Sequence, residues 1–202
     1  GTTPANIVII GGGVVGTNAA KLAVGVGANV TIMDRSVPRL RQLDDIFGGS
    51  LKTRYSTGAA IEEVITTADL VVGAVLIPGA AAPRLIRRDQ LSSMRQGSVL
   101  CDVAIDQGGC FETSHATTHE DPVYDIDGVV HYCVANMPGS VPLTSSHALN
   151  NVTLPFTMAL ADKGVKALDD NDHLMNGLNV RGGKITHPAV IDALGDSPRL
   201  SA

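Results

Sequence analysis

Short apolar runs alternate along the first two thirds of the chain with segments whose apolar residues recur at helical spacing. The apolar runs predict strands at 6–10, 29–33, 51–55, 70–76, 98–105 and 129–134. The helical spacing predicts helices beginning at Val14 and over 37–47, 59–67 and 88–94. Strands that are apolar on both faces and alternate with helices predict an α/β fold with a doubly wound parallel sheet and right-handed crossovers.

The pattern changes after Pro142. A long helix is predicted over 145–166, with Pro155 inside it, followed by helical pieces at 172–178 and 188–194. Its apolar residues Leu149, Val152, Phe156 and Leu160 recur at spacings of three and four, so they share one face. We therefore expect one domain at 1–142 and a C-terminal helical segment at 143–202 whose apolar face needs a partner.

Three glycines interrupt the first apolar run at the point where the helix begins. Gly11, Gly13 and Gly16 form G-x-G-x-x-G between a predicted strand and a predicted helix, which is the context of the dinucleotide fingerprint of Rossmann-type folds. The free N–H groups at the helix N-terminus suit a pyrophosphate. Asp34 ends the next strand, where its carboxylate suits a ribose 2′-hydroxyl. The pattern predicts a Rossmann-type domain that binds NAD rather than NADP.

Ligands of doubly wound sheets bind beyond the carboxyl ends of the strands. The predicted strand ends place there Gly11 to Gly13, Asp34, Ser56, Val75, Leu76, Asp106, Asn136 and Met137. Asp106 is expected to face the nicotinamide end of the dinucleotide. Capping of its own loop is an equally good interpretation of this residue type, because Asp is common in turns. Asp102, within the predicted strand, is expected to be structural.

Composition and charge exclude several classes of protein. The chain has 15 Lys and Arg against 20 Asp and Glu, a net charge of −5, which argues against nucleic acid or an anionic membrane as partner. No apolar run approaches the roughly 20 residues that span a bilayer. The three cysteines have no C-x-x-C spacing and His115, His119 and Glu120 lack further ligands, so we expect free thiols, no metal site and a cytoplasmic protein.

Several stretches together closely resemble bacterial alanine dehydrogenase, within the group that also contains the pyridine-nucleotide transhydrogenases. They are GGGVVGTNAAKLAVG, RLRQLDDIFG, ADLVVGAVLIPGAAAP, CDVAIDQGGCFET, HYCVANMPGSVP and LNNVTLPF. The resemblance covers essentially the whole chain, and the full run of motifs favours the dehydrogenase over the transhydrogenase.

The resemblance implies oxidative deamination of L-alanine with NAD to pyruvate, ammonium and NADH. It implies that Asp106 is the active-site aspartate. The implied NAD contacts are Val14, Asp34, Arg39, Ser56, Val75, Leu76, Val103, Ala104, Ile105, Asp106, Val134, Ala135, Asn136 and Met137. His115 departs from the pattern, because some members have a basic residue against the cofactor there.

The resemblance also implies a substrate domain before Asn6, holding the cations for the substrate carboxylate and the acid-base histidine, to which the segment from Ser145 returns. We expect this chain to lack that domain and to be inactive by itself. A homo-oligomer, commonly a hexamer, is implied as well. The alternatives are the NAD(H)-binding subunit of a proton-translocating transhydrogenase and a non-catalytic NAD-binding module.

Overall fold

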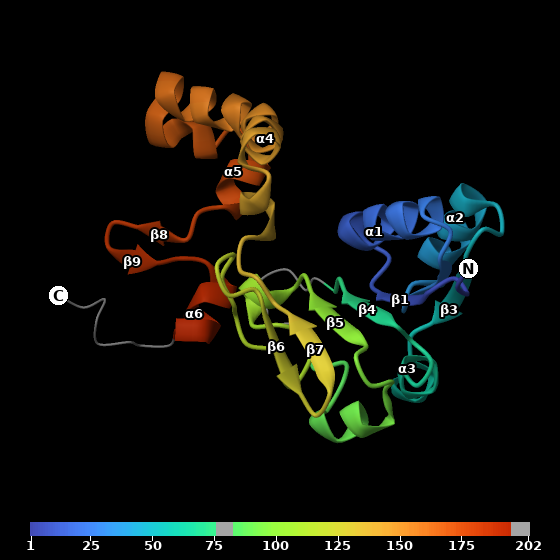
Figure 1. Ribbon diagram of the computed structural model, residues 1–202. Helices are drawn as coiled ribbons and strands as arrows, with labels where there is room; N and C mark the ends of the chain where they lie inside the picture. Colours follow the sequence, from blue (N-terminus) through green and yellow to red (C-terminus); the bar gives the residue numbers. More distant parts are fainter. Residues whose placement is uncertain (76–82, 195–202) are drawn as a thin grey trace. The chain divides into compact units, whose positions relative to one another are not determined.

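The computed structural model describes residues 1–75 and 83–194 (Figure 1). Its contacts divide the chain into two compact units, Gly1–Met137 and Pro138–Ala202. The first unit contains the whole of a seven-stranded sheet, and the second unit is mainly helical.

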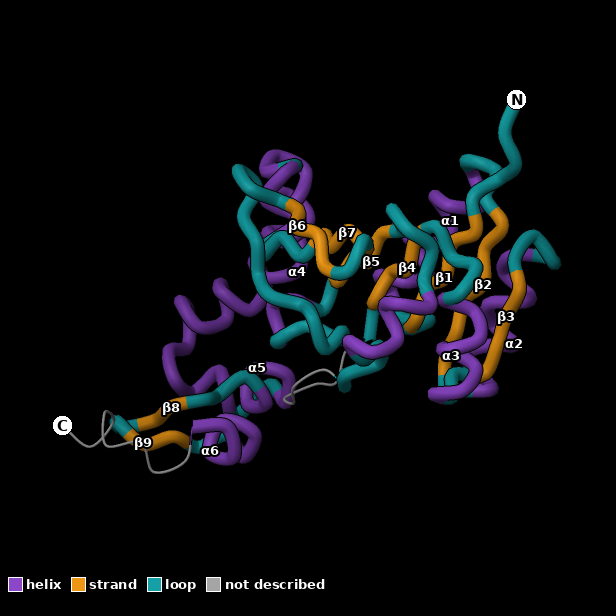
Figure 2. The backbone as a smooth tube through the Cα atoms, turned by 60° about the horizontal axis from the view of Figure 1, so that its bottom comes forward, coloured by secondary structure: helices purple, strands orange, loops and turns teal. Residues whose placement is uncertain are grey.

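The sheet of the first unit has the strand order β3-β2-β1-β4-β5-β7-β6 (Figure 2). All neighbouring strands run parallel except β6 and β7. The chain therefore crosses from one half of the sheet to the other between β3 and β4, and the strand order reverses where β1 lies beside β4, as in a Rossmann-type fold. The strands are β1 Asn6–Ile10, β2 Asn29–Asp34, β3 Lys52–Tyr55, β4 Leu70–Gly73, β5 Val99–Asp102, β6 Val123–Ile126 and β7 Val129–Tyr132.

Capping side chains and a glycine set the ends of two helices of this unit. In α2, Val37–Phe47, the Ser36 hydroxyl accepts a hydrogen bond from the Arg39 N–H, and Gly48 ends the helix at φ +55°. In α3, Gly58–Ile65, the Thr57 hydroxyl caps in the same way. The other helices are α1 Val14–Gly25 and the 3-10 turns η1 Arg88–Ser93 and η2 Ile105–Gln107. The predicted helix starts at Val14 and at Val37 are confirmed.

One hairpin at the sheet edge contradicts the expectation of a sheet with parallel strands alone. Strand β6 pairs antiparallel with β7 across Asp127 and Gly128, which have φ values of +55° and +82°. Two successive residues with positive φ form the turn whose twist matches a two-residue hairpin. The Asp-Gly pair between two runs of strand-forming residues is a signal for this hairpin in the sequence.

Three strands end earlier than their apolar runs predict. Strand β7 stops at Tyr132, not at residue 134. Strand β5 stops at Asp102, not at residue 105, because the Asp102 carboxylate accepts a hydrogen bond from the Ala104 N–H and turns the chain out of the sheet. Strand β4 stops at Gly73, and Ala74 and Val75 follow it as irregular chain. Leu76 lies outside the described residues.

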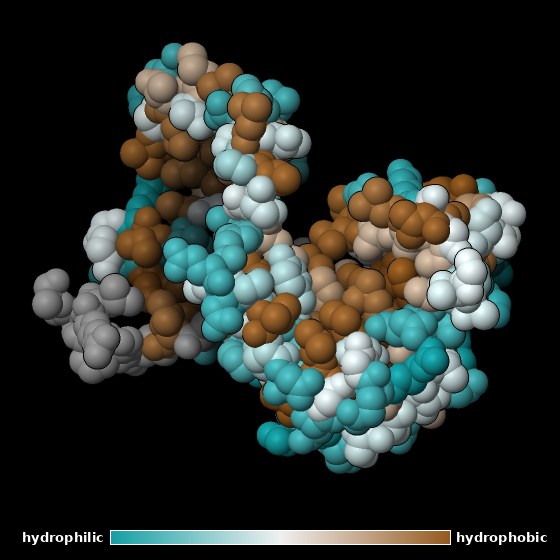
Figure 3. Space-filling view, viewed as in Figure 1, coloured by the Kyte–Doolittle hydropathy of each residue, from teal (hydrophilic) through white to brown (hydrophobic). Residues whose placement is uncertain are grey.

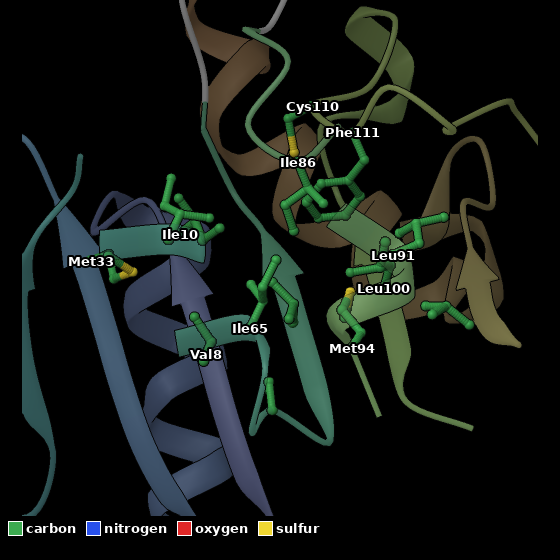
Figure 4. Packing of buried hydrophobic residues seen from close by; sticks show 14 of the residues in the cluster. Val8, Ile10, Met33, Ile65, Ile86, Leu91, Met94, Leu100, Cys110 and Phe111 are labelled. Carbon is green, nitrogen blue, oxygen red and sulfur yellow. The ribbon is translucent and has the colours of Figure 1, made fainter. Parts of the chain in front are cut away.

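Two apolar clusters cover the two faces of the sheet. Val8 and Ile10 of β1 belong to one cluster with Ile65 of α3, and Figure 4 shows this cluster extending across the sheet to Leu91 and Phe111. Ile9, between them, belongs to the other cluster, which includes residues of α1 and α2. Successive strand residues point to opposite faces, so both faces of β1 are buried. This burial explains why its sequence is apolar throughout.

The second unit begins after Met137. It contains α4 Pro142–Lys163, η4 Gly164–Leu168, α5 Asp172–Asn176, the hairpin β8 Val180–Arg181 with β9 Lys184–Ile185, and α6 Pro188–Leu194, with η3 Met137–Ser140 at its start. The predicted long helix is present, three residues earlier than expected at both ends. The β8–β9 hairpin was not predicted, although Gly182 and Gly183 between two short runs are a signal for it.

Helix α4 has no buried residue among its 22. Leu149, Val152 and Leu160 of the predicted apolar face are exposed, and brown apolar side chains are visible over this helix in Figure 3. No helix in residues 1–75 and 83–194 combines the length and the apolarity that a bilayer crossing requires.

Candidate dinucleotide site

The carboxyl ends of the parallel strands meet at one edge of the sheet. Main-chain hydrogen bonds continue past the last strand residues: Gly11 N–H donates to Met33 C=O, Ala74 N–H to Ile10 C=O, and Val103 N–H to Gly73 C=O, at 2.8, 2.8 and 2.9 Å. Ser56 N–H donates in the same way to Asp34 C=O at 3.0 Å. The segments after β1, β2, β3, β4 and β5 are thereby fixed side by side, as the fold predicts for a ligand site.

Two glycines of the G-x-G-x-x-G motif are required by packing. A Cβ on Gly11, which has φ +110°, would lie 2.5 Å from the Ala74 carbonyl oxygen. A Cβ on Gly16 would lie 1.8 Å from the Gly11 carbonyl oxygen. These contacts hold the turn against β4 and bring α1 close to β1.

Gly13 differs from these two glycines. A Cβ at Gly13 would meet nothing within 4 Å, and the residue is exposed. Packing within this unit therefore does not require glycine here. The open space over the loop is where a ligand would approach the main chain.

The N-terminus of α1 is free for an anion. Its N-cap residue is Gly13, no side chain caps it, and its first turn contains no acidic residue. The first N–H groups of a helix lack partners within the helix and carry partial positive charge, so they attract phosphate. Val14, the next residue, is 80% exposed at this end.

Asp34 lies at the end of β2 beside the glycine turn. Its Oδ2 accepts a hydrogen bond from Gly12 N–H at 2.7 Å, and its Oδ1 accepts one from Ser36 N–H at 2.8 Å. The carboxylate is half-buried. Two carboxylate oxygens have about four acceptor positions, so two remain for the hydroxyls of a ribose.

Arg39 of α2 holds the same turn from the other side. Its Nε donates to Gly12 C=O at 2.6 Å, and its Nη2 donates to the Thr17 hydroxyl at 2.7 Å. Thr17 in turn donates to Gly13 C=O at 2.6 Å. Thr17 is not predictable from the sequence, because nothing in the motif marks it. In the residues described here, Arg39 contacts the turn itself.

An open cleft of about 440 Å³ adjoins this region beyond β3. Its walls come from the ends of β2 and β3, the start of α3 and the segment before Ile86. The lining residues are Arg35, Tyr55, Ser56, Thr57, Gly58, Ile61, Arg84 and Leu85. Ser56, predicted from the strand end, is among them.

Asp106 lies in η2, after β5, and is exposed. Its Oδ1 accepts a hydrogen bond from Asn136 N–H at 3.2 Å, and His119 Nε2 is 3.1 Å from the Asn136 carbonyl oxygen, to which it donates. Asn136 has φ +52°, a left-handed conformation that Asn adopts more readily than most residues. The segments after β5 and β7 are thus joined through the side chain of Asp106.

The remaining predicted residues differ in accessibility. Asn136 and Ala135 are exposed, and Val75, Val103 and Met137 are half-buried, whereas Ala104, Ile105 and Val134 are buried. No group of His, Cys, Asp and Glu suited to a metal ion occurs in residues 1–75 and 83–194.

The three cysteines are free, with Cys110 and Cys133 buried. Burial raises the pKa of the Cys101 thiol to about 11 and also raises the pKa values of the other two thiols. Near neutral pH these side chains are therefore protonated and poorly nucleophilic.

Comparison with known proteins gives a consistent picture. The family described as "Alanine dehydrogenase/PNT, C-terminal domain" matches residues 1–188. An alanine dehydrogenase of Halomonas elongata is 62% identical over 196 residues, which is 96% of this chain and 53% of the relative. An L-alanine dehydrogenase structure is 52% identical with a TM-score of 0.88, covering 96% of this chain and 54% of that one.

A transhydrogenase structure from Sinorhizobium meliloti is also similar. It is 32% identical with a TM-score of 0.69, over 94% of this chain and 52% of that one. The chain spans about half the length of the curated relatives it matches.

Proposed function

This chain belongs to the alanine dehydrogenase/PNT C-terminal domain family, and we propose that it is the NAD-binding half of an L-alanine dehydrogenase. The proposed reaction is the oxidative deamination of L-alanine to pyruvate and ammonium. The observation that carries the proposal is the 62% identity to an alanine dehydrogenase across 96% of the chain. The identity of 32% to a transhydrogenase is much lower, which favours the dehydrogenase.

The chain's own residues fit NAD, which accepts a hydride when bound. The uncapped N-terminus of α1 and the open space over Gly13 suit the pyrophosphate. Asp34 has acceptor positions left for the ribose hydroxyls and would repel a 2′-phosphate. The cleft beside Ser56 supports placement of the adenosine part there.

The nicotinamide end is assigned to the segments after β4, β5 and β7. The proposed contacts are Val75, Leu76, Val103 to Asp106 and Val134 to Met137, of which Leu76 lies outside the described residues. Asp102 ends β5 and is buried, whereas Asp106 follows β5 and is exposed, so Asp106 is the one able to reach a substrate. We assign it the role of catalytic carboxylate, which orients the reacting group and balances charge near it.

The segment from residue 143 is proposed to complete a substrate domain. Its long helix α4 exposes apolar side chains along its length, which supports a partner surface supplied by further chain or by a second copy. We propose a homo-oligomer, a hexamer by resemblance. The three free thiols support a reducing compartment such as the cytoplasm.

A chimera tests this function. In it, the present chain replaces the matching stretch of the Halomonas elongata alanine dehydrogenase, so that the remaining half comes from a known enzyme. We expect alanine-dependent NADH formation by the chimera and NAD binding without turnover by the chain alone. Asp106→Asn in the chimera should lower kcat more than NAD affinity. A folded chimera that binds NAD but forms no NADH from alanine would contradict the proposal.

A further inference from the structure

A buried carboxylate lies directly behind the segment that contains Asp106. Asp102, the last residue of β5, has no solvent exposure. Among the described residues no ion pair includes it. A carboxylate in such a position is costly unless hydrogen-bond donors surround it.

Five donors converge on the Asp102 side chain. Oδ1 accepts from Ala104 N–H at 3.0 Å and from the Cys110 thiol at 3.3 Å. Oδ2 accepts from Cys110 N–H at 2.8 Å, from Phe111 N–H at 3.3 Å and from the Ser114 hydroxyl. Every contact is a donation to the carboxylate, which is the pattern that an ionised carboxylate satisfies. An amide at this position would turn its own donors toward some of these N–H groups.

These contacts close a loop around Asp102. Ala104 begins the loop and Cys110 ends it, and Asp106 lies between them in η2. Gly109 passes so close that a Cβ on it would lie 2.8 Å from Asp102 Oδ2, and its φ is +76°. One side chain thus fixes both ends of the loop whose middle presents Asp106.

The same carboxylate is connected to the other half of the site. The Ser114 hydroxyl that donates to Asp102 also accepts from the Cys133 thiol at 3.9 Å. Cys133 follows β7 and begins the segment that contains Asn136, the residue whose N–H binds Asp106. Both partners of the Asp106–Asn136 contact are therefore connected to Asp102.

We propose that Asp102 is a positioning residue of the dehydrogenase reaction, which acts by fixing the place of Asp106. The proposal rests on the proposed function. Asp102 is buried and has no contact with solvent, so it touches neither substrate nor cofactor. It acts through the loop it closes, because a displacement of about 1 Å in a catalytic group can cost about 100-fold in rate.

A double-mutant cycle in the chimera tests the proposal. Asp102→Asn should lower kcat by about 100-fold, while the dissociation constant of NADH, followed by its fluorescence, changes less than about threefold. In an Asp106→Asn background the same change should lower kcat less than about twofold, because the group it positions is already altered. A purely structural role would multiply the loss equally in both backgrounds, and that result would overturn the proposal.

A second readout needs no catalysis. In the present chain, Asp102→Asn should accelerate amide hydrogen exchange at Cys110 and Phe111 but not in β1. Asp125→Asn is the matched control, because the Asp125 carboxylate accepts a main-chain N–H, that of Gly128, in the β6–β7 turn. It should leave kcat unchanged. Unchanged exchange at Cys110 in Asp102→Asn would contradict the proposed loop closure.

If Asp102→Asn does not fold, Ser114→Ala replaces it in the cycle, because it removes one donor and leaves the buried carboxylate intact. It should lower kcat more than NADH affinity, and equal losses in both would count against the proposal. An unaltered chimera that is folded but inactive would instead overturn the proposed function, and the positioning role with it. The two failures are thus distinguished by the parent chimera.

Discussion

The carboxylate of Asp34 accepts a hydrogen bond from the main-chain N–H of Gly12 at 2.7 Å. The two residues are 22 positions apart and belong to the ends of neighbouring strands. The residue proposed to bind the ribose therefore also fixes the turn proposed to bind the pyrophosphate. The two parts of the candidate dinucleotide site are mechanically linked before any ligand binds.

We expect the chain to prefer NAD to NADP, because the Asp34 carboxylate would face the 2′-phosphate. Asp34→Ala should weaken NAD binding about tenfold or more, because a hydrogen bond to a charged group contributes about that factor to affinity. The same change should reduce the difference in affinity between NAD and NADP. Calorimetric titration with both dinucleotides measures this. Asp45→Ala, an exposed acid on α2, should change neither affinity. Equal affinity of the unaltered chain for NADP and NAD would contradict the assignment of Asp34.

Gly16→Ala should mainly affect the stability of the fold, whereas Gly13→Ala should mainly affect NAD binding. The Gly16 change should destabilise the fold by about 2 kcal/mol or more, because the new Cβ would overlap the Gly11 carbonyl oxygen. The Gly13 change should alter the unfolding free energy by less than about 1 kcal/mol and yet weaken NAD binding, because its Cβ would enter the space open to the ligand. Urea denaturation and NAD titration of both variants separate the two effects. Unaltered NAD binding by Gly13→Ala would contradict the proposal that the pyrophosphate binds at this turn.

Arg39→Lys should weaken NAD binding although the charge is kept. A lysine does not reproduce the fork that contacts Gly12 C=O and the Thr17 hydroxyl together. We expect a loss of about tenfold, with a change in unfolding free energy near 1 kcal/mol. Arg41→Lys on the exposed side of α2 is the matched control. Equal effects of the two changes would show that the contacts of Arg39 with the turn are unimportant for binding.

The stability of the first unit should fall as the pH drops below about 6.5, in part because of His131. His131 is fully buried, Nδ1 donates to Val129 C=O at 2.9 Å, and Nε2 is 2.7 Å from the Thr113 hydroxyl. Burial lowers its pKa, so the unfolded chain binds a proton that the folded chain does not. One such group contributes at most about 1.4 kcal/mol per pH unit.

Denaturation between pH 7.5 and 5 checks this dependence on His131. His131→Gln should flatten the fall in unfolding free energy, whereas His147→Gln, at an exposed position on α4, should leave it unchanged. If the unfolding free energy falls with pH equally in His131→Gln and in the unaltered chain, other groups are responsible for the fall.

The exposed apolar residues of α4 should make the isolated chain associate. Leu149 and Val152 are each 63% exposed, and contiguous apolar surface of this kind favours contact with another surface. We expect the chain to elute above its monomer mass in size-exclusion chromatography, or to be cut by protease after about residue 142. Leu149→Ser with Val152→Ser should shift it toward the monomer. A monomer with a protease-resistant C-terminal segment would contradict this expectation.

Much of the fold was predictable because its signals are local. The β-branched run before Gly11, the cap at Ser36 and the stop at Gly48 each act within a few residues, and the structure follows all three. The β6–β7 hairpin was not predicted, although its signal is equally local. The signal is the Asp-Gly pair, Asp127 and Gly128, which forms the turn. The shortening of β5 combines a local contact, in which the Ala104 N–H donates to the Asp102 carboxylate, with donors that arrive from residues 110–114.

The sequence by itself determined the order of the strands and helices along the first unit and the region in which each strand ends, because periodicity and glycine sterics act along the chain. Which of these residues meet was decided only by the order and register of the strands. Arg39 reaches Gly12 across 27 positions and Asp106 reaches Asn136 across 30, and no local pattern specifies either contact. Asp102 shows the same division most clearly. Its residue type and position suit a strand end, but its burial and its five donors exist only because the chain after β5 folds back around it.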